Sequence, residues 1–227
     1  IETGYGISLR PLSVFANEVY KDCDIHRFEV KLSNEDAAHY TEKDKLLAAR
    51  MHKAITIIQF KLEGEIIRRR PEFEMDDRML LHHIDLKRGV VHIDGKDYML
   101  KDTNWPTLDP KDPYRLSIEE EDLIRKILHS FESSEKMKKH MRCFFRHGGM
   151  YQVCNSNLLF HASIPMNPDG TFKSVRILGQ DYKGRALLDR VDQLIRTAYF
   201  KTGEQEEVEY AHDYIWYLWG GKDSPLF

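Results

Sequence analysis

The hydrophobic positions in residues 33–69 recur at steps of three and four residues, the spacing of an amphipathic helix. They are Leu47, Met51, Ala54 or Ile55, Ile58, Leu62 and Ile66. Ser33, with Asp36 three residues later, forms a weak capping box, and Pro71 ends the helical pattern. At the rise of an α-helix this segment would be a rod of roughly 50 Å. Because a helix of this length would extend beyond a compact core, we expect it to form a cap, an arm or a dimer surface.

Four further segments carry helical periodicity. They are residues 9–20, 117–145, 184–199 and 206–219. The second begins with a capping box formed by Ser117 and Glu120, and its periodicity predicts one helix that continues to about Phe145. The last segment is dense in aromatic residues, which usually belong to a core.

Two pairs of short β-rich segments are joined by residues typical of turns. Asp94 and Gly95 lie between residues 90–93 and 97–100, and glycine accepts the positive φ that a tight hairpin requires. Residues 150–154 and 158–161 predict a second pair of strands. Because the character of the sequence changes near Gly148, we expect a helix-rich domain over residues 1–147 and a second domain over 148–227.

Composition excludes several classes of protein. Hydrophobic residues at 41% and charged residues at 31% are ordinary for a globular protein, and no apolar run is long enough to span a bilayer. A net charge of −3 favours neither nucleic acid nor an anionic membrane as partner. Cys23, Cys143 and Cys154 are few and irregularly spaced, which favours reduced thiols in the cytoplasm. The chain starts without methionine or a signal peptide and ends on apolar residues, so we expect an internal fragment of a longer protein.

His161 is the first candidate for a functional role. It follows the apolar run 158–160 within a segment bounded by Asn157 and Pro165, which predicts a buried strand with an imidazole where it reaches the surface. Imidazole is a common ligand for transition metals, and the end of a buried strand would hold it rigidly. The alternative is a packed histidine bonded to a backbone carbonyl.

Cations near glycines are the second set of candidates. Gly220-Gly221 followed by Lys222 and Ser224 suits a phosphate, which accepts hydrogen bonds from backbone N–H groups and pairs with a lysine. Arg185 lies at the start of a predicted helix, where the helix dipole favours anions. A glycine that merely ends a helix beside a solvated lysine, and an arginine that solvates a helix start, are the alternatives.

Several stretches of the chain together resemble class III fructose-1,6-bisphosphatase. The matching stretches are residues 5–12, 51–55, 58–64, 69–73, 157–165, 169–170, 182–187 and 216–227. This cytoplasmic family of manganese-dependent phosphatases belongs to the calcineurin-like metallophosphoesterases. The resemblance implies an α+β fold, with a helix-rich insertion or cap over residues 1–147 and part of an α/β metallophosphoesterase sandwich over 148–227.

The resemblance also implies a chemistry. It implies hydrolysis of the 1-phosphate of fructose 1,6-bisphosphate in gluconeogenesis at a site that holds two Mn²⁺ ions. His161 is then a metal ligand, although Ala162-Ser163 replaces the two glycines that follow this histidine in relatives. Lys222, Ser224 and Arg185 become candidates for phosphate or sugar contacts.

The family's other metal-binding motifs are absent from these residues. The Asp-x-His, Gly-Asp-x-x-Asp, Gly-Asn-His-Asp/Glu and Gly-His-Thr motifs do not occur, so we expect this chain to be inactive by itself. The alternative hypothesis is a non-catalytic module in which the helix over 33–69 serves dimerisation or regulation. A nucleic-acid contact through residues 68–70 is disfavoured by the net charge.

Overall fold

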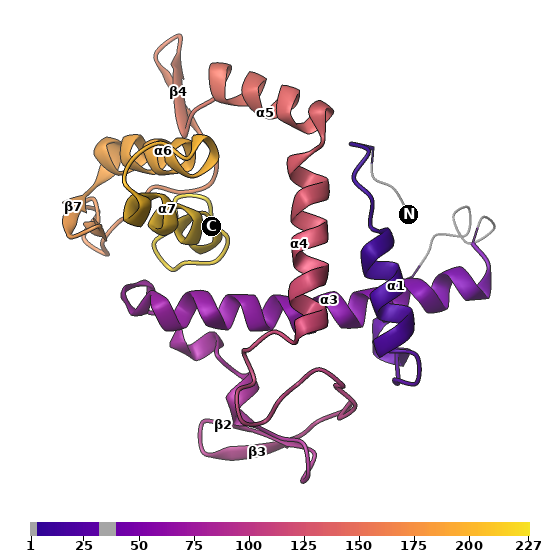
Figure 1. The fold of residues 1–227 in the computed structure, drawn as a ribbon. Coiled ribbons are helices and arrows are strands. Elements are labelled where there is room, and N and C mark those ends of the chain that lie inside the picture. Colours follow the sequence, from indigo (N-terminus) through magenta and orange to yellow (C-terminus); the bar gives the residue numbers. More distant parts are fainter. Residues whose placement is uncertain (1–3, 32–39) are drawn as a thin grey trace. The chain divides into compact units, whose positions relative to one another are not determined.

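A computed structural model of the chain describes residues 4–31 and 40–227 (Figure 1). The chain divides into two compact units, residues 1–138 and 139–227, which we describe separately. Helices and small antiparallel sheets make up both units, so the fold class is α+β as predicted. In the described residues, each sheet has two or three strands. Every helix in the same ranges is too short or too polar to cross a membrane.

The core of the first unit lies where three helices meet. They are α1 (Arg10–Val19), α3 (Glu42–Arg69) and α4 (Ile118–Glu132). The buried residues of this core are Leu12, Phe15, Ala16, Tyr20, Met51, Ala54, Ile58 and Leu123. Among the residues of this unit that the structure describes, four 3₁₀ turns connect the elements: η1 (His26–Phe28), η2 (Pro71–Phe73), η3 (Asp76–Arg78) and η4 (Leu81–His83).

The long helix is shorter than the sequence predicted. Helix α3 has 28 residues and begins after Thr41, whose side chain accepts a hydrogen bond from the backbone of Asp44 while the Asp44 carboxylate accepts one from Thr41. This reciprocal capping box satisfies N–H groups that have no partner inside the helix and so sets the start. The predicted start at Ser33 lies outside the described residues.

The single helix predicted over residues 117–145 is wrong. The Ser117–Glu120 capping box is present, but the helix breaks after Glu132 and a second helix, α5 (Glu135–His147), follows. The Ser134 hydroxyl accepts a hydrogen bond from the Met137 backbone and donates one to the Tyr5 carbonyl. A serine that binds backbone groups in this way competes with a continuous helix.

The predicted hairpin near residues 90–100 is confirmed. Strands β2 (Val90–Ile93) and β3 (Lys96–Met99) pair antiparallel, and β1 (Ile84–Asp85) extends the sheet to three strands. Asp94 and Gly95 both have positive φ, 49° and 75°, as a tight two-residue turn requires.

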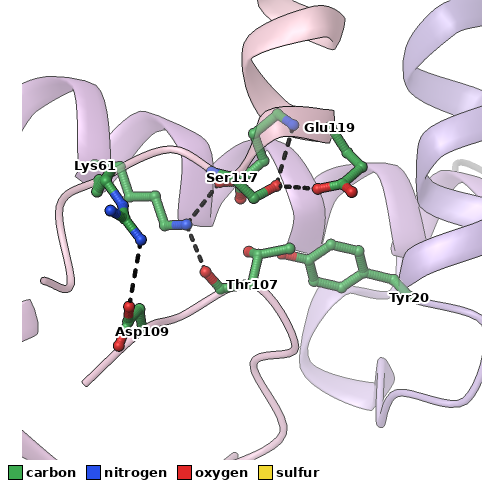
Figure 2. A network of polar contacts seen from close by, with 8 residues as sticks. Tyr20, Lys61, Thr107, Asp109, Ser117 and Glu119 are labelled. Atoms are coloured by element: carbon green, nitrogen blue, oxygen red, sulfur yellow. Dashed lines mark hydrogen bonds and ion pairs between the residues drawn. The ribbon is translucent and has the colours of Figure 1, made fainter. Parts of the chain in front are cut away.

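Two lysines of α3 are fully buried and hold the segment that leads to α4. Lys61 Nζ lies 2.6 Å from Glu120 Oε2 and 2.6 Å from the Thr107 carbonyl, and both charged side chains are 0% exposed. Figure 2 shows Lys61 reaching from its helix to Thr107 and to the start of α4 beside Ser117. Two turns earlier, Lys53 Nζ lies 2.7 Å from Asp102 Oδ2.

Tyr20 completes this network. Its hydroxyl lies 3.0 Å from Thr107 Oγ1, and the two residues are drawn side by side in Figure 2. Burial raises the pKa of the Tyr20 phenol far above its usual value, so the group is neutral at physiological pH. The segment between β3 and α4 is therefore held to α3 and α1 by buried polar contacts.

The second unit is built on two packed helices, α6 (Gly184–Phe200) and α7 (Gln205–Tyr217). Its buried apolar residues include Leu187, Leu188, Val191, Leu194, Val208, Ala211 and Tyr214. Two hairpins accompany the helices: β4 (Tyr151–Cys154) with β5 (Asn157–Phe160), and β6 (Val175–Ile177) with β7 (Gln180–Tyr182). The pairing predicted for residues 150–161 is thus confirmed.

We predict that Lys61→Met lowers the free energy of unfolding by about 3–5 kcal/mol, because it leaves the Glu120 carboxylate buried without its cation. Urea denaturation measures this change. Lys126→Met is the control, since the Lys126–Asp122 pair is more than 40% exposed on both sides and should contribute less than about 1 kcal/mol. The double change Lys61→Met with Glu120→Leu should recover most of the loss. A single change no more costly than the control would contradict the prediction.

Candidate functional site

A cavity of about 710 Å³ lies within the second unit, and His161 is one of its lining residues. Its polar lining includes His147, Asp192 and Arg196, while Phe160 and Leu226 are among its apolar residues. A volume of this size accommodates a small organic molecule. We refer to it as the His161 cavity.

The prediction of a buried strand before His161 is wrong. Every residue of β5 is exposed, and the imidazole of His161 is exposed as well. The hairpin turns through Asn155 and Ser156, both with positive φ, and its apolar side chains do not enter a core of the described chain. An apolar run indicates that a strand is suited to burial, but it does not supply the layer that covers it.

An arginine clamp positions His147, which the sequence analysis did not single out. Arg196 Nη1 donates to the Phe145 carbonyl at 2.6 Å, and Nη2 donates to the Gly148 carbonyl at 3.1 Å. Asp192, one turn earlier on α6, accepts from Arg196 Nε at 2.6 Å. Because these carbonyls flank His147, the clamp holds the turn that brings this imidazole to the His161 cavity. The sequence offered one signal for this clamp: Asp192 and Arg196 lie four residues apart on a predicted helix, a spacing at which side chains can pair.

The glycine in this turn is required by the close approach of the backbone. A Cβ atom on Gly148 would lie 2.8 Å from the Phe144 carbonyl oxygen, closer than real side chains approach. The same carbonyl accepts the Gly148 N–H at 2.7 Å, which closes the end of α5.

The structure brings two of the predicted segments together. Ser163 donates its backbone N–H to the Pro225 carbonyl at 3.2 Å, and its hydroxyl lies within 3.3 Å of the Ser224 carbonyl. Leu226 lines the same cavity as His161. The C-terminal segment that contains Lys222 and Ser224 therefore lies beside the segment that contains His161.

Within that C-terminal segment the two candidates differ in environment. Ser224 is buried, and its hydroxyl donates to the Leu218 carbonyl at 2.8 Å and accepts from the Leu226 N–H at 3.0 Å. Lys222 is exposed, and the neighbouring Asp223 pairs with Lys173 at 2.5 Å. The substrate contact assigned to each remains a prediction, and the geometry gives Ser224 a structural role as well.

Arg185 lies near the edge of the His161 cavity. Its side chain is 81% exposed, pairs with Asp189 at 3.5 Å, and lies 5.8 Å from the ring centre of Tyr151, a cavity residue. Gly184 begins α6 with a φ of +53°, and a Cβ there would lie 3.1 Å from the Phe172 ring. Arg185 is thus accessible from solvent although it pairs with Asp189, and its contact with a phosphate or sugar remains a prediction.

The described residues do not by themselves form a manganese site. In residues 4–31 and 40–227, no group of three or more His, Cys, Asp or Glu side chains is arranged to hold a metal ion. His161 offers one imidazole, whereas a bound divalent metal needs several ligands. Its role as a metal ligand therefore remains a prediction that requires further ligands.

Comparison with known proteins places this geometry in context. A family model described as Firmicute fructose-1,6-bisphosphatase matches residues 1–227. Proteins named fructose-1,6-bisphosphatase class 3 from Parabacteroides distasonis, Bacteroides fragilis and Clostridioides difficile are 87%, 59% and 49% identical to this chain over 227 residues. Each match covers all of this chain but 34% of the relative, so the chain spans about a third of their length. No solved structure matches the chain.

We predict that Ser224→Ala lowers the free energy of unfolding by about 1–3 kcal/mol, because the buried Leu218 carbonyl and Leu226 N–H lose their partner. Thermal and urea denaturation followed by circular dichroism measure the effect. Ser133→Ala is the matched control, since that hydroxyl is exposed and bonds the Ser130 carbonyl at 3.3 Å. Equal stability of the two variants would show that the Ser224 hydroxyl is not structurally required.

Proposed function

Because the chain belongs to the Firmicute fructose-1,6-bisphosphatase family, we propose that it is part of a metal-dependent phosphatase that hydrolyses the 1-phosphate of fructose 1,6-bisphosphate. The family match over the whole chain carries this proposal. It is supported by the position of His161, an exposed imidazole at a cavity large enough for a sugar bisphosphate. The place of this reaction in gluconeogenesis, in the cytoplasm, belongs to the same proposal.

The proposed cofactor is a pair of Mn²⁺ ions, to which His161 would contribute one ligand. Bound metal ions in such sites activate water and neutralise charge on the phosphoryl oxygens. Because the described residues supply a single candidate ligand, the proposal requires that the remaining ligands come from sequence outside these 227 residues. The chain alone is then inactive.

We infer separate roles for the two domains predicted from the sequence, whose boundary at residue 147 lies close to the boundary between the two units at residue 138. Residues 1–147 correspond to a helix-rich insertion or cap, and residues 148–227 to part of a metallophosphoesterase sandwich. The second assignment is supported by the β4–β5 hairpin, whose apolar residues are exposed on both faces. Strands of this kind are typical of sheets that have layers on both sides.

A non-catalytic role for the first unit is the second candidate function. Helix α3 leaves the apolar residues Leu46, Phe60 and Leu62 exposed along its length. Such side chains favour contact with another helix, so α3 is a candidate surface for homodimerisation or regulation. This role is compatible with a phosphatase at the level of the whole protein.

The proposal is tested in a full-length chimera, in which these 227 residues replace the matching third of the Parabacteroides distasonis relative. We expect phosphate release from fructose 1,6-bisphosphate with Mn²⁺ added, and a loss of at least ~100-fold in His161→Ala, since second-shell ligand changes alone cost 10–100-fold. The 227-residue chain should release none. His26→Ala is the control, because His26 is an exposed surface residue paired with Glu29. Absence of turnover in the chimera would refute the phosphatase and favour the non-catalytic role.

A second substitution tests the phosphate contact. The substrate has two phosphates and the metal ions engage one, so the other needs a cation from the protein. We expect Lys222→Ala in the chimera to raise KM for fructose 1,6-bisphosphate several-fold while kcat stays similar. Lys43→Ala, an exposed lysine in the first unit, is the control. An unchanged KM would remove Lys222 from the site.

A further inference from the structure

The charged side chains that line the His161 cavity pair with each other. Arg196 Nε donates to Asp192 Oδ2 at 2.6 Å, and Arg196 Nη2 lies 3.4 Å from Asp192 Oδ1. Of the described residues that line the cavity, no other is Asp, Glu, Lys or Arg. Because the two opposite charges lie side by side, this wall of the cavity presents no net negative charge that would repel a phosphate.

The guanidinium of Arg196 is largely committed to the chain itself. An arginine beside a cavity is a natural candidate for binding phosphate, because its planar N–H groups match the phosphate oxygens. Here Nη1 and Nη2 also donate to the Phe145 and Gly148 carbonyls, so four of the five N–H groups of this side chain are used within the fold. Arg196 therefore serves the backbone on either side of His147 and not a ligand.

The imidazole of His147 has the opposite character. His147 is exposed, and in residues 4–31 and 40–227 its ring has no hydrogen-bond, ion-pair or aromatic partner. A neutral imidazole offers one N–H donor and one acceptor nitrogen, and a protonated one offers two donors. The clamp thus fixes the backbone beside a polar side chain whose hydrogen-bonding groups are left for another molecule.

Aromatic packing holds the same turn from the side of α6. The ring of Phe145 lies 4.7 Å from the ring of Tyr199 and 5.4 Å from that of Phe200, measured between ring centres. The Arg196 guanidinium lies 5.6 Å from the centre of the Phe145 ring. An imidazole whose main chain is already fixed loses little further freedom when it binds a ligand, which is the condition for a preorganised site.

We propose that His147 is a substrate-binding residue of the His161 cavity, which donates a ring N–H to a phosphate oxygen of the sugar bisphosphate, and that Arg196 is the residue that positions it. The inference rests on the proposed function, which supplies the class of substrate. Both imidazoles line the same cavity, so a phosphate bound there has a hydrogen-bond donor from this chain in addition to the proposed metal ions.

The contact is tested in the full-length chimera by His147→Ala, which removes both ring nitrogens. We expect kcat/KM for fructose 1,6-bisphosphate to fall by about 10- to 100-fold, the effect of losing one hydrogen bond to a charged group. The melting temperature should stay within ~1 °C, because an exposed ring without partners contributes little to stability. His129→Ala, which removes an exposed histidine of α4, is the control and should change neither quantity. An unchanged kcat/KM in His147→Ala would overturn the proposal.

Two further measurements separate a substrate contact from a structural effect. Added imidazole should restore part of the lost activity in His147→Ala, because the free ring can occupy the space of the missing side chain. Either His147→Gln or His147→Asn should retain most of the activity, since each keeps an N–H donor close to one of the ring nitrogens. Failure of imidazole and of both amide variants to restore kcat/KM would assign His147 a structural role and overturn the proposal.

The positioning role of Arg196 is tested by Arg196→Lys, which keeps the charge beside Asp192 but loses the planar group that reaches both carbonyls. We expect a smaller loss of kcat/KM than in His147→Ala, and no additional loss when the two changes are combined, because both act through one contact. Arg142→Lys, at an exposed arginine of α5, is the control. Losses that multiply in the double variant would show that Arg196 acts independently of His147.

Binding without turnover distinguishes this inference from the phosphatase itself. Calorimetry of the chimera in EDTA measures the dissociation constant of fructose 1,6-bisphosphate, which should rise at least ~10-fold in His147→Ala and stay unchanged in His129→Ala. A chimera that binds the bisphosphate through His147 but shows no turnover refutes the phosphatase alone. An active chimera in which His147→Ala changes neither kcat/KM nor the dissociation constant refutes this inference alone. Absence of both turnover and binding would overturn both.

Discussion

The first unit depends on a buried ion pair between two helices. Lys61 and Glu120 are both removed from water, and desolvation of two charges is costly unless each is paired and hydrogen-bonded. Here Lys61 also donates to Thr107, and Glu120 accepts from the Ser117 backbone at the start of α4. The pair therefore specifies how the segment before α4 crosses α3. An apolar contact at this place would fix the position of that segment along α3 less specifically, because it lacks directional hydrogen bonds.

A polar clamp has the corresponding role in the second unit. Arg196 satisfies two backbone carbonyls with one planar side chain, and Asp192 orients it. The clamp fixes the turn that presents His147 to the cavity shared with His161. In both units, buried or half-buried charged side chains hold irregular segments in position. These segments lack the repeated backbone hydrogen bonds of helices and sheets.

The exposed hairpin connects the fold to the proposed function. The proposed two-metal phosphatase site would need several ligands, and His161 is the one ligand proposed to come from this chain. The apolar residues beside His161 have the character of an interior sheet, yet they face solvent in the described chain. Family membership, the single candidate ligand and the exposed apolar hairpin are explained together if the site is completed by a longer polypeptide.

Local patterns in the sequence predicted where most helices and both confirmed hairpins lie, and they indicated the family, but they missed the break between α4 and α5. The capping box at Ser117, the Asp94–Gly95 turn and the pairing of residues 150–161 act over a few residues, so they were predictable. The tertiary structure decided which side chains are buried and which residues they contact. Periodicity shows which face of an element is apolar, but not what covers it, so the exposure of β5 could not be read from its sequence. The Arg196 clamp joins residues 48 and 51 positions apart, and the contact of the Ser163 hydroxyl with the Ser224 carbonyl joins residues 61 positions apart, so only the folded structure brings them together.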